Sequence, residues 1–264
     1  MSNLGWLDVS DIHINALLLL EPFHIQYIAE REPDALMGTV LKAHPYISWI
    51  FENRYAPIHE YIERCLSLAE QPIHPETLRH AEIQILDSMQ DWLIYVLNPA
   101  RYDQLDFLNW DDASLLEMAD FRHKSVLDIG SGTGRLAFAV APIAKVVYAI
   151  EPVANLRAYL WEKRSRLGID NVYPIDGKID QIPFPDNFTD ILITGHVFGE
   201  HPLEEYQEMQ RVVRDGGMII LHPGTNAKSE NVAHRFLLAE GFEFSTFTEP
   251  GDGLKRKYKK VIHK

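Results

Sequence analysis

Short apolar runs rich in β-branched residues alternate with helical patterns from about residue 125 onward. Five such runs lie at 125–130, 146–152, 172–177, 190–197 and 218–224. Strands that alternate with helices form a parallel sheet, because each right-handed crossover returns the chain to the same edge. The alternation therefore predicts a doubly wound α/β sheet with helices on both faces.

The last part of the chain adds two more expected strands, 242–249 and 255–264, joined by the turn residues Pro-Gly-Asp-Gly. Two strands joined so closely must be antiparallel. The sheet is therefore expected to have seven strands and to be mostly parallel. Its expected helices are 112–121, which leads into the first strand, 154–168, 202–217 ending at two glycines, and one near 228–240.

Residues 1–110 have a different texture, which predicts an all-helical extension. The segment 74–99 places its apolar residues on roughly one face, and the similar segment 46–70 is interrupted at Pro57. The tract Leu17–Leu20 has no basic residue before it, so we interpret it as the buried face of a short helix rather than a signal segment. We predict two domains: a helical lid over residues 1–110 and a ligand-binding core over 111–264.

Composition narrows the classes of partner. Hydrophobic residues make up 46% of the chain, enough for a substantial core. The single cysteine, Cys65, cannot form an internal disulfide, which favours a reducing, cytoplasmic setting. We expect no membrane-spanning segment. The net charge is −13, and residues 1–124 hold most of it, with 20 acidic and 8 basic residues. Such a surface repels a phosphate backbone, which argues against nucleic-acid binding. We interpret it as a solvated acidic surface, with recognition of a cationic partner as the alternative.

Three glycines lie between the first expected strand and the next helix, in the run VLDIGSGTGRLAFAV. Gly130, Gly132 and Gly134 occupy the carboxyl edge of the sheet, where ligands of α/β proteins bind, and without a Cβ they let a ligand touch the backbone. A dinucleotide loop needs glycine or alanine where this chain has Arg135, and a phosphate-cradling loop needs Lys-Ser or Lys-Thr. The pattern is instead DxGxGxG, which includes Asp128.

Four motifs in order resemble those of class I S-adenosylmethionine-dependent methyltransferases, in particular their small-molecule, type 11-like branch. They are LDIGSGTG at 127–134, AIEP at 149–152, IPFPDNFTDIL at 182–192 and EMQRVVRDGGMIIL at 208–221. The resemblance covers about residues 110–224. It implies a Rossmann-like methyltransferase fold and transfer of a methyl group from S-adenosyl-L-methionine to a small or medium-sized metabolite, leaving S-adenosyl-L-homocysteine.

The resemblance also implies roles for individual residues. Asp128 is expected to face the methionine ammonium, Glu151 to accept from both ribose hydroxyls, and Asp176 to accept from the adenine amine. Each has a purely structural alternative: Asp128 as a cap of loop amides and Asp176 as a turn former. The other residues assigned to the cofactor are Gly130, Ser131, Gly132, Thr133, Gly134, Gly177 and Thr194, with Pro152, Leu156 and Ile182 as walls of the adenine site, although Leu156 suits a helix core equally.

The reacting end is expected after the fourth strand. His196 ends that strand and could act as a general base, since an imidazole titrates near neutral pH; the alternative is a structural histidine. His201, His222 and Glu200 could approach the same edge. His196 and His201 lack the i, i+4 spacing of a helical metal pair, so we predict no metal site. Tyr102 and Trp110 are expected to close over the methionine end, or else simply to pack the two domains together.

Two other functions compete with methyl transfer. One is a nicotinamide-dependent oxidoreductase of Rossmann type, against which Arg135 and the final strand pair argue. The other is a non-catalytic S-adenosylmethionine-binding interaction protein, because methyl transfer requires positioning more than any particular side chain. The sequence does not indicate the acceptor or the oligomeric state.

Overall fold

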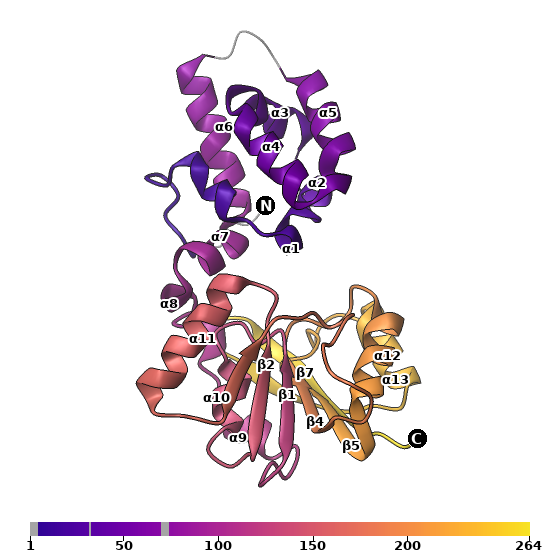
Figure 1. The fold of residues 1–264 in the computed structure, drawn as a ribbon. Coiled ribbons are helices and arrows are strands. Elements are labelled where there is room, and N and C mark those ends of the chain that lie inside the picture. Colours follow the sequence, from indigo (N-terminus) through magenta and orange to yellow (C-terminus); the bar gives the residue numbers. More distant parts are fainter. Residues whose placement is uncertain (1–4, 32, 70–73) are drawn as a thin grey trace. The chain divides into compact units, whose positions relative to one another are not determined.

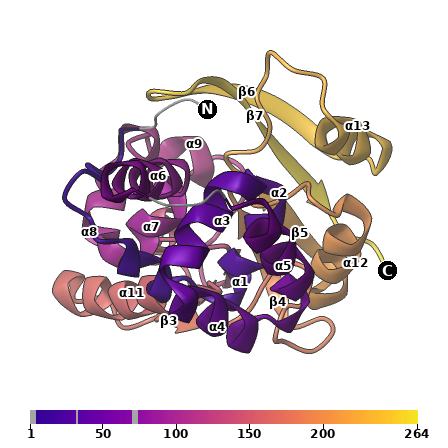
Figure 2. The same cartoon turned by 90° about the horizontal axis from the view of Figure 1, so that it is seen from above.

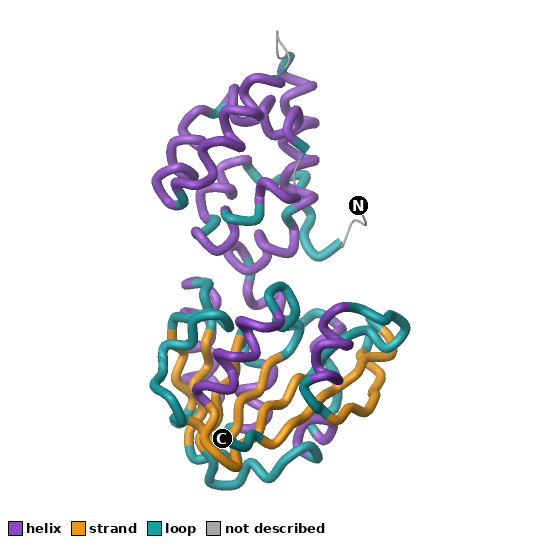
Figure 3. The backbone as a smooth tube through the Cα atoms, turned by 90° about the vertical axis from the view of Figure 1, so that its right-hand side faces the viewer, coloured by secondary structure: helices purple, strands orange, loops and turns teal. Residues whose placement is uncertain are grey.

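The structure is a computed structural model that describes residues 5–31, 33–69 and 74–264. The chain divides into two compact units, Met1–Tyr102 and Asp103–Lys264, which we call the helical unit and the sheet unit. Figure 3 shows strands in the sheet unit only. The predicted helical end of segment 46–70 includes residue 70, which lies outside the described residues.

The helical unit confirms the predicted all-helical extension. The break at Pro57 falls in a 3₁₀ turn, and the segment 74–99 is divided at Met89 into two helices. The described helices of this unit are η1 (Ile14–Leu19), α1 (Pro22–Ile25), α2 (Ile28–Arg31), α3 (Asp34–Ala43), α4 (Pro45–Arg54), η2 (Ala56–Ile58), α5 (His59–Leu68), α6 (Pro75–Ser88), α7 (Gln90–Leu97) and α8 (Pro99–Tyr102).

A close helix contact organises this unit. Gly38 in α3 lies against α5, where a Cβ on Gly38 would come within 2.0 Å of the Cys65 carbonyl oxygen, so only glycine permits this approach. Leu17 and Leu20 are fully buried, which confirms that the leucine tract faces a core. Helix α3 was not predicted from the sequence.

The sheet unit contains the predicted seven-stranded sheet. Its strand order is β3-β2-β1-β4-β5-β7-β6, with β1 to β5 parallel and β7 antiparallel to both β5 and β6. Figure 2 shows β6 and β7 as a long hairpin. The strands are β1 (Ser125–Ile129), β2 (Val146–Ile150), β3 (Val172–Ile175), β4 (Thr189–Thr194), β5 (Val213–Leu221), β6 (Glu243–Glu249) and β7 (Gly253–Val261).

Helices cover both faces of this sheet, as Figure 1 shows for α10 and α11 on one side and α12 and α13 on the other. Alternate residues of β1 enter different cores: Val126 packs with α10 and α11, whereas Leu127 packs with α12 and α13. The helices of this unit are η3 (Asp106–Leu108), α9 (Ala113–Leu116), α10 (Arg135–Val140), α11 (Ala154–Leu167), α12 (Pro202–Val212) and α13 (Val232–Ala239).

Two predicted boundaries were wrong. The helix expected over 112–121 is only the four-residue α9, because Lys257 Nζ donates to the Ser114 carbonyl, and Met118 N–H donates to Leu115 instead. The helix expected over 202–217 ends at Val212, and the two glycines belong to β5. Hydrogen bonds of 2.8 Å between 216–217 and Ile262 extend the strand there.

No helix of the described segments combines the length and apolar character needed to cross a membrane.

The core position of Leu127 leads to a stability prediction. Leu127→Ala should lower the free energy of unfolding of the sheet unit by about 2–5 kcal/mol, because it leaves a cavity at a fully buried position. Hydrogen exchange of sheet-unit peptides in urea measures this unit separately. Leu203→Ala, at a residue 51% exposed on α12, is the control and should change little; equal effects of the two changes would contradict the assignment of the core.

Candidate functional site

The loop after β1 is shaped by three glycines with left-handed backbones. Gly130, Gly132 and Gly134 have φ angles of +67°, +54° and +85°, which side chains rarely tolerate. The N–H groups of Gly130 and Ser131 donate to the Ile150 carbonyl at 2.8 and 3.0 Å, so the loop folds over the end of β2. A Cβ at Gly134 would lie 2.6 Å from the Phe138 ring, so close packing also requires glycine.

Glu151 connects this loop to the end of β2. Its carboxylate accepts a hydrogen bond from Gly132 N–H at 2.8 Å and another from Val153 N–H at 2.9 Å, and the residue is only 4% exposed. The two contacts hold a buried negative charge next to the glycine loop.

Asp128 places a second buried carboxylate at the end of β1. One oxygen accepts from Ala137 N–H of α10 at 3.0 Å, as the alternative role of a cap anticipated. The other oxygen, Oδ1, is buried and has no hydrogen-bond partner among the described residues. Burial, and to a smaller extent the charge of Glu151, raises the pKa of Asp128 to about 7. A cationic group bound at this oxygen would favour the ionised form of the carboxyl group.

At the end of β3, Asp176 is linked to Glu151 by an arginine that contacts both residues. Arg157 Nη1 donates to the carbonyls of Glu151 and Pro152 at 2.8 and 2.7 Å and to Asp176 at 3.1 Å. The Asp176 side chain remains 73% exposed. A Cβ on Gly177 would lie 2.7 Å from Pro183 and 2.9 Å from Ile150, so the backbone passes close to β2.

The walls expected for adenine are largely core residues. Leu156 and Ile182 are 2% and 3% exposed, whereas Pro152 is partly exposed. Thr194 is also buried, and its hydroxyl donates to the Ile129 carbonyl at 2.9 Å, which joins the ends of β1 and β4. Their roles toward a ligand remain predictions.

The glycine loop is also held by an ion-pair network that was not predicted from the sequence. Lys163 of α11 donates to the Thr133 carbonyl at 3.0 Å and to Asp103 at 2.7 and 2.9 Å. Asp103 also accepts from the Tyr159 hydroxyl at 2.8 Å. The spacing of Tyr159 and Lys163, four residues apart on one helix, was the only sequence signal for this cluster. Ser131 supports the loop from within, by donating to the Asp128 carbonyl at 2.8 Å.

Arg135, which stands where a dinucleotide loop has glycine, is fully engaged. Its guanidinium lies 3.8 Å from the centre of the Trp110 ring, pairs with Asp112 at 2.5 Å and donates to the carbonyls of Leu108 and Trp110. Cation–π contact and ion pairing together anchor the segment that precedes α9.

The two residues expected to close the site belong to different units of the chain. Trp110 is 5% exposed, and its ring lies 4.4 Å from that of His222. Tyr102 belongs to the helical unit, where its ring lies 4.8 Å from Tyr95 and 6.2 Å from Trp6. Their closing role stays a prediction.

The histidines after β4 and β5 differ in environment. His196 Nε2 lies 2.8 Å from the Glu249 carboxylate at the end of β6, a contact that the sequence analysis missed. His222 is fully buried, contacts the Ser114 hydroxyl at 2.7 Å, and burial lowers its pKa to about 3. His201 is the N-cap of α12. In the described part of the chain, no group of three or more His, Cys, Asp or Glu side chains is arranged to hold a metal ion.

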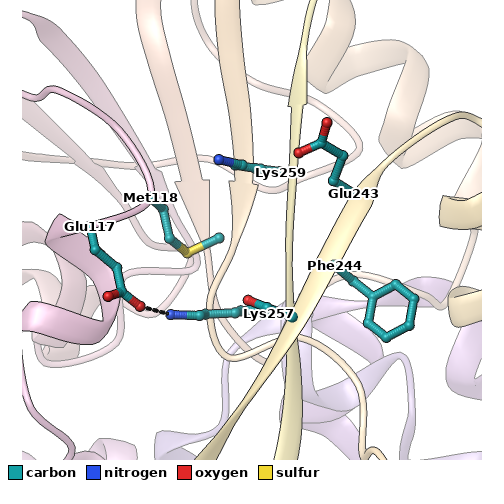
Figure 4. Close-up of a pocket in the computed structure, with 7 residues that line it drawn as sticks. Glu117, Met118, Glu243, Phe244, Lys257 and Lys259 are labelled. Carbon is teal, nitrogen blue, oxygen red and sulfur yellow. Dashed lines mark hydrogen bonds and ion pairs between the residues drawn. The ribbon is translucent and has the colours of Figure 1, made fainter.

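A pocket of about 290 Å³ lies elsewhere in the sheet unit, between the residues after α9 and the hairpin (Figure 4). Its charged walls include Glu243 near the start of β6, and Lys257, which pairs with Glu117. It lies at the opposite end of β6 from Glu249, so it is separate from the strand ends described above.

Comparison with known proteins agrees with this geometry. Residues 127–221, from β1 to β5, match the family described as methyltransferase domain. Part of the sheet unit therefore resembles a methyltransferase domain. The matched range contains the glycine loop, both buried carboxylates and His196.

Similar proteins share this domain. Demethylmenaquinone methyltransferase of Geobacillus kaustophilus is 32% identical over 136 residues, 46% of this chain and 57% of that protein. Ubiquinone/menaquinone biosynthesis C-methyltransferase of Coxiella burnetii is 26% identical over 138 residues, 46% of this chain and 54% of that protein. The chain thus spans little more than half the length of these relatives.

A solved structure shows the same fold. The crystal structure of a SAM dependent methyltransferase from Aquifex aeolicus has a TM-score of 0.51 and 23% identity, and covers 63% of this chain and 99% of that chain.

The raised pKa of Asp128 leads to a prediction about stability and pH. An unfolded aspartate loses its proton near pH ~4, whereas folded Asp128 keeps it to about 7. Folding therefore takes up a proton in between, and the stability that Asp128 contributes falls as the pH rises from about 4 to about 7. The difference in unfolding free energy, Asp128→Asn minus wild type, should grow by up to about 1.4 kcal/mol per pH unit there.

Urea unfolding at several pH values in this window measures that difference. Asp180→Asn, at an exposed aspartate of the same unit, is the matched control and should show no such trend. A difference that does not vary with pH for Asp128→Asn would contradict the protonated state of this carboxyl.

Proposed function

We propose that this chain transfers a methyl group from S-adenosyl-L-methionine to a small or medium-sized metabolite. The observation that carries the proposal is the unpartnered buried oxygen of Asp128 beside a loop of three left-handed glycines. A carboxylate in this state gains most from a cationic ligand, because an ammonium group would supply the missing hydrogen bond and offset the cost of burial. The methionine ammonium is such a group.

The other residues of the site fit this cofactor. Glu151 lies between the glycine loop and Val153, where a carboxylate suits the hydroxyls of a ribose. Asp176 is exposed and could accept from an adenine amine, with Arg157 fixing its position. When bound, S-adenosylmethionine supplies a methyl group on a positively charged sulfur; the residues of this chain orient it and exclude water.

The charges disfavour the competing oxidoreductase. A pyrophosphate would meet the buried carboxyl groups of Asp128 and Glu151. The nearby cations are already paired, namely Arg135 with Asp112, Lys163 with Asp103 and Arg157 with Asp176. Like charges at such short range cost binding energy.

The related quinone methyltransferases support a small-molecule acceptor rather than a nucleic acid. The buried, free Cys65 supports the cytoplasmic location that we expect.

A binding experiment tests the proposed function. S-adenosylhomocysteine should bind saturably in isothermal titration calorimetry, and NADH should not. Gly130→Ala should weaken this binding at least tenfold, because a Cβ there would lie 2.2 Å from Val197 and distort the loop. Gly168→Ala has the same left-handed strain, at φ +65°, but open space around it, so it controls for backbone strain. Saturable binding of NADH without S-adenosylhomocysteine would reverse the assignment.

A second experiment tests the ribose contact. Glu151→Ala should weaken S-adenosylhomocysteine binding by about 1.5–3 kcal/mol, typical of lost hydrogen bonds to a charged group. The control is Glu162→Ala, at an exposed glutamate of α11, which should leave the affinity unchanged. Identical affinities for the two variants would remove the ribose role from Glu151.

A further inference from the structure

The backbone at His196 is strained. Its φ angle is +60°, which is uncommon for a residue with a large side chain. The chain is held there by the hydrogen bond from His196 N–H to the Pro223 carbonyl, at 3.1 Å. Strain of this kind persists where the surrounding structure imposes it, and it is concentrated at functional sites. The imidazole of this residue contacts Glu249, at the end of β6.

One side of this imidazole contacts a buried carboxylate. The Glu249 side chain is 0% exposed and lies 2.8 Å from His196 Nε2, whereas the histidine side chain is 36% exposed. An ionised carboxylate can only accept a hydrogen bond, so in the neutral imidazole this contact places the proton on Nε2 and leaves the lone pair on Nδ1. No described residue forms a hydrogen bond with Nδ1 of His196.

A lysine compensates the buried charge of Glu249. Lys255 Nζ lies 3.4 Å from the second carboxylate oxygen, and its side chain is 9% exposed. It also pairs with Asp252 at 2.5 Å in the hairpin turn. The second oxygen has no hydrogen bond among the described residues, so Lys255 acts on it through charge alone. Burying such a carboxylate costs free energy that its partners need not recover, so the arrangement is weak evidence of stabilisation.

The imidazole lies next to the glycine loop. Thr194 pairs in register with Ile129, so the chain that follows β4 runs beside the loop that follows β1. A Cβ on Gly130 would come within 2.2 Å of Val197, the residue directly after His196. The ring of Phe107 meets the imidazole edge to face, with centres 5.7 Å apart, and provides an apolar neighbour.

We propose that His196 is the general base of the reaction, that Glu249 is its positioning residue, and that the acceptor presents a phenolic or enolic hydroxyl. This inference rests on the proposed function. The hydroxyl proton moves to Nδ1, and an electron pair of the oxygen forms the new bond to the methyl carbon. The electron pair of the broken carbon–sulfur bond stays on sulfur. A phenol, with a pKa near ~10, is within reach of an imidazole, unlike an aliphatic alcohol.

The first measurement separates this inference from the proposed function. His196→Asn keeps a residue type that tolerates a left-handed backbone, and Glu249→Gln keeps the shape of the side chain. Both variants should bind S-adenosylhomocysteine within about threefold of the wild type, because neither residue is assigned to the cofactor. Absence of binding to the wild type would sink the proposed function; loss of binding only in these variants would overturn the assigned roles.

The second measurement follows S-adenosylhomocysteine formation with catechol, 4-hydroxybenzoate and 4-nitrophenol, and with dimethyl sulfide as an acceptor without a proton to lose. We expect turnover of phenols to O-methyl ethers. His196→Asn should lower kcat by about 100-fold or more and make the rate depend more steeply on phenol acidity. Glu249→Gln should have a smaller effect that Glu249→Asp partly restores.

Several outcomes would overturn the inference. They are turnover of dimethyl sulfide alone, a carbon-methylated product, an unchanged kcat in His196→Asn, or no turnover of any phenol by protein that binds the cofactor. Glu243→Gln, at an exposed glutamate of the same strand, is the matched control and should leave kcat unchanged.

The third measurement does not depend on activity. Nitrogen NMR of histidine-labelled protein, assigned with His196→Asn, should show Nε2 protonated and Nδ1 unprotonated in the wild type. Glu249→Gln should change the tautomer population, and Glu243→Gln should not. A wild type protonated at Nδ1 would contradict the proposed base.

Discussion

The carboxylate of Glu151 is the interaction on which the rest of the site depends. It accepts from Gly132 N–H and Val153 N–H, so a single buried side chain fixes the glycine loop against the end of β2. Its charge also contributes to the raised pKa of Asp128. Glu151 therefore fixes the shape of the glycine loop and also disfavours the ionised form of Asp128. A cationic ligand would stabilise that ionised form, so the local geometry bears on which ligand the site can bind.

The C-terminal hairpin extends the site to residues far along the chain. Because β7 is antiparallel to both of its neighbours, β6 runs in the same direction as the parallel strands and ends at their carboxyl edge. Glu249 therefore arrives beside His196, 53 residues away in sequence. The hairpin completes the sheet and also brings a buried carboxylate to the edge where ligands bind.

The elements with a clear period and clear ends were predicted well. Strand β1 and helix α11, whose C-cap is Gly168, agree with the expected ranges to within about one residue. The errors arose where distant groups compete for backbone hydrogen bonds. Lys257 limits α9 by binding the Ser114 carbonyl, and Ile262 draws Gly216 and Gly217 into β5. Neither competitor can be identified from the sequence around the affected segment.

The candidate site divides in the same way. Asp128, Glu151 and the three glycines belong to short motifs whose position follows from adjacent strand ends, so the sequence could place them. Lys163 and Asp103 hold the loop across 60 residues, which no local pattern indicates. The contacts of the Trp110 ring with Arg135 and His222 were likewise not predicted, because those residues lie 25 or more positions away in the sequence.

Periodicity and motif spacing are local properties, so the sequence alone was enough to predict the alternation of strands and helices, the carboxylates beside the glycine loop and the resemblance to methyltransferases. Only the tertiary structure decided which oxygen of Asp128 lacks a partner, how Arg135 is occupied and which carboxylate meets His196. These contacts depend on which side chains are brought together by packing. Burial sets the strength of each charge interaction, and it exists only once the sheet has formed.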